Sequence, residues 1–196
     1  MKEQKEGEKP EWQNIQNHEK ETLLKMSEIS LWLDNYNDIF SDFDPRPYSQ
    51  RALSDDFLQE AKRASKDKVS GSLELQFLIP HDKRNTQLEN TIKKRLREHF
   101  KKHYLQINQE VKGIIRKGLI FMFFGIIFMF LATFILFKYG SEKNILMSFL
   151  IVLLEPAGWF SFWEGLNLII FNSKKKKPEL DFYEKMSSSE ILFLSY

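Results

Sequence analysis

The stretch GLIFMFFGIIFMFLATFILF at residues 118–137 contains no charged residue and decides the fold class. Twenty residues of helix rise about 30 Å, which is the thickness of the hydrocarbon core of a bilayer. A second apolar stretch, ILMSFLIVLLEPAGWFSFWEGLNLIIF, follows at residues 145–171 after the short polar segment 138–144. The two stretches predict a transmembrane helical hairpin, in which residues 138–144 form the external loop.

Basic residues flank the hairpin on the side of the two chain ends. They are Lys101, Lys102, Lys112, Arg116 and Lys117 before the first stretch, and Lys174, Lys175, Lys176 and Lys177 after the second. The loop has only Lys138 and Lys143. Because basic residues are retained on the cytoplasmic side, we expect a multi-pass protein of the cytoplasmic membrane with both termini in the cytoplasm. Anionic lipid headgroups are the expected partners of Lys112, Arg116, Lys117 and Lys174 to Lys177.

Composition limits the other classes of function. The 196 residues suffice for a membrane anchor and one small domain, and they include no cysteine, which excludes disulfides and thiolate chemistry. The net charge of +2 is too small to indicate nucleic-acid binding, and the basic run at residues 93–102 lacks the aromatic platform of single-strand readers. No cofactor is expected. The polar first twenty residues are unlike a signal peptide, so the first span is expected to direct insertion.

The remaining segments predict a small α+β cytoplasmic domain. Residues 1–19 are charged and expected to be mobile, whereas residues 20–40 carry apolar side chains every three or four positions and predict an amphipathic helix. A second helix is expected after Ser54, as its cap, up to about Lys66. Leu73, Leu75, Phe77 and Ile79 recur at a period of two, with Glu74 and Gln76 on the other side, and predict a strand over residues 73–79. The β-prone end of the tail, residues 191–196, is expected to pair with that strand.

Between these parts lies the longest periodic pattern of the chain. Its apolar members are Leu88, Ile92, Leu96, Phe100, Tyr104, Ile107 and Val111, and no proline occurs between Pro80 and Pro156. We expect a stalk helix over residues 83–117 that continues into the first span. Its stripe requires a partner, either the N-terminal helices or the stalk of another subunit. After the lysine run, Pro178 is expected to end any helix of the tail, residues 172–196.

Glu155 is the strongest candidate for a functional residue. It lies eleven residues beyond Asn144, or about 16 Å into the second span. A carboxylate there costs on the order of 3 kcal/mol, which the nine apolar residues among 145–154 can offset at about 0.3–0.6 kcal/mol each. We expect Glu155 to be protonated, bonded to Trp159, or facing another subunit or a wet cavity. It is either a proton or ion site, with a kink at Pro156 and Gly158, or a structural hydrogen bond in an assembly.

The other polar residues of the second stretch are weaker candidates. Glu164 lies about 30 Å from the outer end, at the inner interface, and is not expected to pair with Glu155. Trp159 and Trp163 share a face and indicate an aromatic belt, and Asn167 is a further polar residue near the inner boundary. A re-entrant turn at residues 155–158 is the alternative to a kinked span.

No metal site is expected. His99 and His103 are four residues apart, but the order of a zinc-binding HExxH motif is absent. Asp34, Asp38, Asp42 and Asp44 lack the glycine and terminal glutamate of a calcium-binding loop. Their neighbours, asparagines and prolines, indicate capping and turn roles instead.

Three segments, DFDPRP at 42–47, RALSDDF at 51–57 and FLIP at 77–80, resemble a family of small prokaryotic two-span membrane proteins of undefined function. The resemblance extends from about Leu31 to the end of the second apolar stretch. It implies two membrane spans and a turn at DPRP, and it implies no activity, substrate, cofactor or site residue.

These observations favour a non-enzymatic membrane protein, an oligomeric scaffold or effector subunit whose cytoplasmic domain binds a protein partner. The second hypothesis is a homo-oligomer that conducts ions or protons with Glu155 in its path. A membrane-anchored enzyme is the third, and no catalytic residue can be assigned to it.

Overall fold

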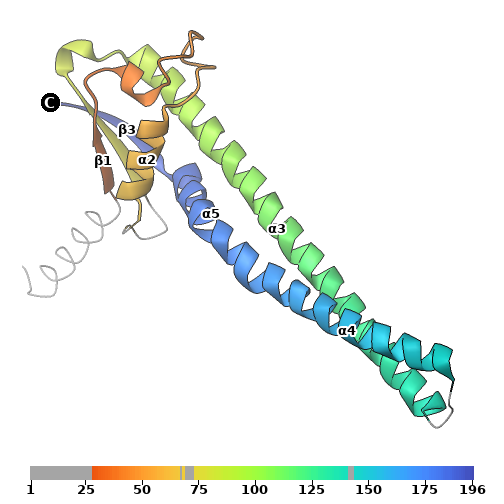
Figure 1. Ribbon diagram of the computed structural model, residues 1–196. Helices are drawn as coiled ribbons and strands as arrows, with labels where there is room; N and C mark the ends of the chain where they lie inside the picture. Colours follow the sequence, from red (N-terminus) through yellow and green to blue (C-terminus); the bar gives the residue numbers. More distant parts are fainter. Residues whose placement is uncertain (1–27, 67, 69–72, 141–143) are drawn as a thin grey trace, which may run out of the picture. The chain divides into compact units, whose positions relative to one another are not determined.

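The computed structural model describes residues 28–66, 68, 73–140 and 144–196, and these divide into two compact units (Figure 1). Unit 1 contains the described residues up to Lys101 together with residues 182–196, and unit 2 contains residues 102–181. The expectation that segments before and after the apolar hairpin form one small α+β domain is therefore confirmed. The N-terminal segment predicted to be mobile lies outside the described residues.

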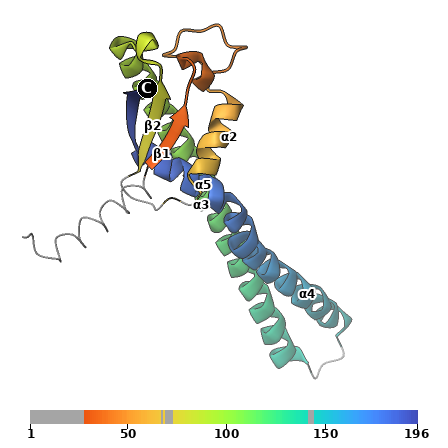
Figure 2. The ribbon, with the colours of Figure 1, turned by 90° about the vertical axis from the view of Figure 1, so that its left-hand side faces the viewer.

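Unit 1 is built on a three-stranded parallel sheet of order β1-β2-β3 (Figure 2). The strands are β1 (Glu28–Trp32), β2 (Glu74–Ile79) and β3 (Glu190–Ser195). The predicted pairing of the tail with the 73–79 strand is present, with Phe77 opposite Phe193. The side chains that point into the core are Ile29, Leu75, Phe77, Ile79, Ile191 and Phe193, all nearly inaccessible to solvent.

Three helical segments complete this core. They are α2 (Asp55–Ala64), the first turns of α3 (Thr86–Tyr139) and the last turns of α5 (Ser173–Ser188). Their buried residues are Phe57, Ala61, Ile92, Leu96, Phe100, Phe182 and Met186. Ser54 caps α2 as expected, because its hydroxyl accepts a hydrogen bond from the backbone N–H of Phe57. Within unit 1, the sheet and α5 are therefore the partners of the predicted stalk stripe.

The predicted helix over residues 20–40 is wrong where the structure describes it. Residues 28–32 form strand β1, and a short 3₁₀-helix, η1 (Tyr36–Ile39), follows. Ile29 pairs in register with Leu75, and Leu31 pairs with Phe77, so the strand period of two governs this segment. A capping box between Asn35 and Asp38 then starts the 3₁₀-helix. Residues 20–27 lie outside the described part of the chain.

The connection between β2 and β3 explains why the two chain ends belong to one unit. Parallel neighbours require a crossover that returns the chain to the starting end of the sheet. Here the crossover runs through a second 3₁₀-helix, η2 (His81–Lys83), then α3, α4 (Ile145–Asn167), η3 (Leu168–Asn172) and α5. The apolar hairpin is thus an insertion within a single crossover connection.

In unit 2, the expected single helix through the stalk and the first apolar stretch is confirmed, because α3 continues without a break to Tyr139. Helix α4 follows the loop, and Pro156 lies inside it without ending it. A re-entrant turn at residues 155–158 is therefore not formed. Two helices among the described residues are long and apolar enough to cross a membrane. Only 11% and 6% of their most apolar segments is buried within the chain.

The expectation that Pro178 ends the helix is wrong. A π-helical segment, η3, joins α4 to α5, and α5 continues through Pro178 to Ser188. A proline inside a helix costs about 3 kcal/mol. Burial of Phe182 and Met186 near the end of α5 contributes about 1.5–3 kcal/mol each, which offsets that cost. Tertiary packing therefore decides this part of the fold.

Candidate functional site

Two pairs of glycines set the register between α3 and α4 in unit 2. An added Cβ on Gly118 would lie 2.8 Å from the carbonyl oxygen of Gly165, and one on Gly125 would lie 2.8 Å from that of Gly158. The paired glycines are seven residues apart on each helix, which is the spacing that keeps one seam facing its partner. Without side chains the two backbones approach closely, as in the small-residue contacts of membrane helices. Gly158, which was expected at a kink, thus also packs against α3.

This register places Glu155 level with Phe128 on the opposite helix. Phe128 is ten residues from Gly118 and nine from Phe137, the two ends of the uncharged stretch. At the rise of a helix these separations are about 15 Å and 14 Å. The register thus places Glu155 at the middle of the apolar part of the hairpin, in agreement with the depth expected from the second stretch alone.

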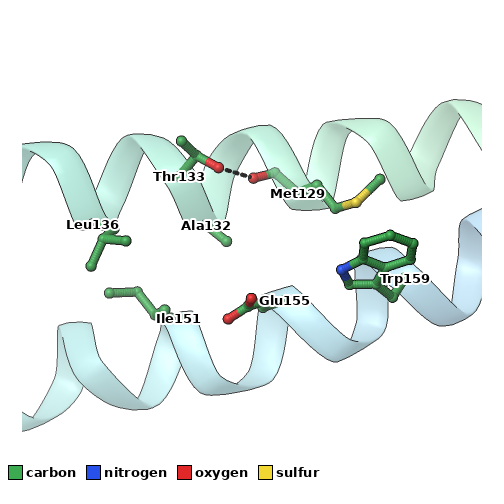
Figure 3. A pocket seen from close by; sticks show the side chains of 7 residues that line it. All are labelled: Met129, Ala132, Thr133, Leu136, Ile151, Glu155 and Trp159. Carbon is green, nitrogen blue, oxygen red and sulfur yellow. Dashed lines mark hydrogen bonds between the residues drawn. The ribbon is translucent and has the colours of Figure 1, made fainter.

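Glu155 lines a groove between the two helices (Figure 3). The groove has a volume of about 180 Å³ and is lined by Met129, Ala132, Thr133 and Leu136 from α3 and by Ile151, Glu155 and Trp159 from α4. The three α4 residues follow at intervals of four, so they share one face of the helix. Glu155 is exposed, which means that the groove is open on one side.

The polar groups around Glu155 leave its carboxyl without a partner among the residues that the structure describes. The Thr133 hydroxyl donates to the carbonyl oxygen of Met129 at 2.9 Å. The Trp159 indole lies one turn beyond Glu155, with its nitrogen on the side of the ring nearer the carboxyl (Figure 3). No hydrogen bond joins the two, and none reaches Glu155 from any residue that the structure describes. The expected alternative of a bond to Trp159 is therefore not realised.

The other polar residues of α4 lie toward the opposite end of the apolar part. By the glycine register, Glu164 is level with Leu119, only two residues from Lys117. Its carboxylate accepts a long hydrogen bond of 3.4 Å from the amide of Asn167. Trp159 and Trp163 are both about half exposed. Glu155 and Glu164 do not form a carboxylate pair, as expected.

Lys176 differs from the other basic residues that were expected to bind lipid headgroups. Its ammonium group lies 3.1 Å from the Glu110 carboxylate and 4.0 Å from that of Glu179. The hydrogen bond to Glu110 raises the pKa of Lys176 above its ordinary value. Lys176 therefore joins α5 to α3, whereas the other six residues of that set, Lys112, Arg116, Lys117, Lys174, Lys175 and Lys177, are exposed.

Two aspartates of unit 1 have structural roles. Asp38 accepts hydrogen bonds from the backbone N–H groups of Asp34 and Asn35, and Asp44 accepts from those of Arg46 and Ala52. The interpretation as caps and turns is confirmed for these two carboxylates. In the described ranges, no three residues of the metal-ligating types His, Cys, Asp and Glu lie close enough together to hold an ion.

Comparison of the chain with protein families, with curated proteins and with solved structures found no match. The resemblance of residues 42–57 and 77–80 to two-span membrane proteins accordingly rests on those residues alone. The candidate site is defined by geometry: a carboxyl at the middle of an apolar hairpin, beside a groove that its own chain leaves open.

Proposed function

We propose that the chain is a non-enzymatic integral membrane protein that acts as a homo-oligomer, in which a second copy covers Glu155. The observation that carries the proposal is the unpartnered carboxyl at the centre of the apolar hairpin. Burying such a group without a hydrogen bond costs several kcal/mol in hydrocarbon. Association that closes the open side of the groove removes that cost by supplying a donor or acceptor from the other copy.

The apolar surface of the hairpin supports the membrane assignment. The large side chains of α3 and α4 are mostly exposed, including Phe123, Phe130, Val152 and Phe160. A soluble protein would bury such residues in its core, whereas lipid accepts them. In this arrangement both chain ends lie in the cytoplasm, unit 1 binds a protein partner there, and the exposed basic residues near the hairpin contact anionic headgroups.

The same groove favours a second function, conduction of protons or ions. It contains the titratable carboxyl of Glu155 and the hydroxyl of Thr133, whose oxygen can still accept a hydrogen bond. Polar groups that line a path through the membrane are typical of conducting assemblies. Pro156, one residue further, has no N–H and therefore leaves a backbone carbonyl in α4 without its helical donor. These groups would line a path only if subunits enclose the groove.

Replacement of Glu155 tests the proposal. The full chain is reconstituted in lipid nanodiscs, and subunit number is measured by native mass spectrometry and by a dilution series. Contacts between polar groups of membrane helices contribute about 0.6–2 kcal/mol each, so Glu155→Leu is expected to weaken association by about 3-fold to 30-fold per contact. The matched control, Glu164→Leu, removes a carboxylate at the border of the apolar part and is expected to leave association unchanged.

Glu155→Gln then separates the two functions. Glutamine keeps the size of the side chain and can still donate a hydrogen bond, but it cannot carry a proton across. Unchanged assembly together with loss of pH-dependent flux into liposomes would favour conduction. Loss of assembly would favour the structural carboxyl, and a monomeric unmodified chain in lipid would refute both.

A further inference from the structure

The loop from Ser41 to Ala52 in unit 1 is closed and internally hydrogen-bonded. Its ends meet at an antiparallel bridge between Phe40 and Leu53, and the backbone N–H of Ser41 donates to the carbonyl oxygen of Ala52 at 2.9 Å. Loops of this length with adjoining ends pack on their own side chains and frequently carry function. In Figure 2 this loop connects η1 to α2.

Asp44 holds the interior of the loop. Its carboxylate accepts from the backbone N–H groups of Arg46 and Ala52 and forms a two-bonded pair with the Arg46 guanidinium, at 2.9 and 2.7 Å. These hydrogen bonds hold the pKa of Asp44 well below its ordinary value, and the largest effect comes from the Arg46 side chain. The Arg51 side chain closes the other side by donating to the carbonyl oxygen of Ser41.

This ordered loop exposes Phe43 almost completely. The Phe43 side chain is 98% exposed, the highest value among the large apolar residues that the structure describes, whereas Phe40, at the start of the loop, is buried. The hydrogen bonds hold the loop backbone that carries this ring, so little backbone freedom is lost when the ring docks. Aromatic residues, phenylalanine among them, are enriched at the core of protein interfaces.

The same loop and α3 form a pocket that fits such a ring. The pocket has a volume of about 250 Å³, and its walls include Pro47, Tyr48, Leu88 and Thr91. An apolar cavity of about 150 Å³ already accommodates benzene, so a phenyl ring can enter. Arg46 and Arg51 also line the pocket, and the carboxylate of Asp42, beside Phe43, is 89% exposed. Within one chain Asp44 already pairs with Arg46, and Asp42 lies 3.9 Å from the Arg51 guanidinium, so the contact between Asp42 and Arg51 is the one that two copies can exchange.

We propose that Phe43 of one copy inserts into this pocket on a second copy, and that the contact is reciprocal. A twofold interface needs a self-complementary surface, and both the anchor and its pocket belong to one small region of unit 1. Asp42 of each copy then lies beside Arg51 of the other. The proposal rests on the self-association proposed above and assigns a second contact between copies, separate from Glu155.

A photoreactive residue at position 43 tests this contact in the full chain. Phe43 is replaced by p-benzoylphenylalanine, and chains with and without heavy isotopes are mixed in nanodiscs, irradiated and analysed by peptide mass spectrometry. Mixed-isotope crosslinks from position 43 to residues 46–51 or 88–91 are expected. Crosslinks to lipid, to another protein or to other segments of a second copy would overturn the proposal.

Substitutions give a second measurement. Phe43→Ser is expected to weaken association of the copies by about 30-fold, the loss typical of an interface anchor, and Phe43→Leu is expected to retain most of it. Exposed Leu194, also in unit 1, provides the control Leu194→Ser, which is expected to have no effect. If the copies associate but all three variants behave alike, this contact is refuted and the role of Glu155 is not. If the unmodified chain is monomeric, both fail.

Discussion

Replacing Gly125 by leucine is expected to force α3 and α4 apart and to destabilise the hairpin by about 1–3 kcal/mol or more. A Cβ at this position would lie 2.6 Å from the backbone nitrogen of Phe162 and 2.8 Å from the carbonyl oxygen of Gly158. Both atoms belong to the backbone of α4, so they cannot move aside as a flexible side chain would. The helices themselves must separate.

The separation can be measured directly because the chain contains no cysteine. Spin labels are attached to cysteines at Phe130 and Val152, which are both 69% exposed and lie nearly level in the glycine register. Gly125→Leu is expected to lengthen the distance between the labels by about 2 Å, the range over which helix spacing varies with the side chains at the contact. Thermal unfolding in the same lipid gives the loss of stability.

Gly113 provides the matched control on the same helix. Apart from its chain neighbours and the nearby backbone of α3 itself, no atom lies within 4 Å of a Cβ built at Gly113. Gly113→Ala is expected to stabilise α3 by about 0.5–1 kcal/mol, because alanine restricts the unfolded chain more than glycine does. Gly125→Ala is expected to have the opposite sign. If both alanine variants stabilise equally, the glycine seam does not hold the hairpin together.

The close contact of α3 and α4 at the two glycine pairs is a feature that the sequence indicates only in part. Gly118 and Gly125 repeat after seven residues, as do Gly158 and Gly165, and this spacing was visible from the start. Glycine is common in membrane helices, so Gly118 and Gly125 do not stand out within an apolar stretch. Gly158 lies two residues after Pro156 and fits a kink as well as a packing contact, and the packing contact becomes visible only with the opposing helix in place.

The correct predictions concern segments with one dominant period. Residues 73–77 alternate strictly, and the pattern beginning at Leu88 repeats every three or four residues, so the strand and the long helix follow from local sequence. Residues 28–40 satisfy both periods, because Ile29, Leu31 and Leu33 alternate while Ile29, Leu33 and Phe40 fit a helical stripe. The partner that selects the strand is β2, more than forty residues away.

The candidate site was predicted only in part for the same reason. Its depth in the apolar stretch follows from counting residues, and the glycine register agrees with it. The groove beside Glu155 depends on which face of α4 meets α3, which no local pattern specifies. The ion pair that removes Lys176 from the set of free basic residues likewise depends on Glu110 of the opposing helix.

The second large effect is expected at the start of α3, where a buried ionic cluster joins this helix to η1. Arg84 donates to both carboxylate oxygens of Glu89, at 2.6 and 3.0 Å, and the Tyr36 hydroxyl donates to the same carboxylate at 2.9 Å. The Tyr36 oxygen in turn accepts from the backbone N–H of Asn85 at 2.8 Å. The Glu89 side chain is only 4% exposed.

Arg84→Leu is expected to destabilise unit 1 by about 3–5 kcal/mol at neutral pH, because it leaves the Glu89 carboxylate buried without its counter-charge. Hydrogen exchange of the β1, β2 and β3 amides in the full chain measures this loss as reduced protection. The control Arg63→Leu breaks a pair with Glu60 in which both side chains are well exposed, 80% and 58%, and is expected to change stability by no more than about 0.5 kcal/mol.

The contribution of Glu89 to the stability of unit 1 is expected to depend on pH with opposite sign in the unmodified chain and in Arg84→Leu. In the unmodified chain, burial acts to raise the pKa of Glu89, but the hydrogen bonds from Arg84 and Tyr36 outweigh it, and the pKa lies below the ordinary 4.5. Glu89 therefore stabilises the fold above pH 4.5, and this contribution is lost as the pH falls through the lower pKa of the folded state. In Arg84→Leu, burial is no longer opposed by Arg84, and the pKa of Glu89 is expected to rise above 4.5. The destabilisation should then decrease as the pH is lowered from about 7 toward 5, because the neutral carboxyl tolerates burial.

Adding Glu89→Leu to Arg84→Leu distinguishes an unpaired charge from a general loss of packing. If the uncompensated carboxylate causes the destabilisation, removing it is expected to restore most of the protection and to abolish the pH dependence, since an apolar pair in place of a buried ion pair is often neutral or stabilising. The Tyr36 hydroxyl would still accept from Asn85, so the start of α3 keeps that contact. A double variant as unstable as Arg84→Leu alone, at every pH, would show that the cluster stabilises unit 1 through packing and not through charge.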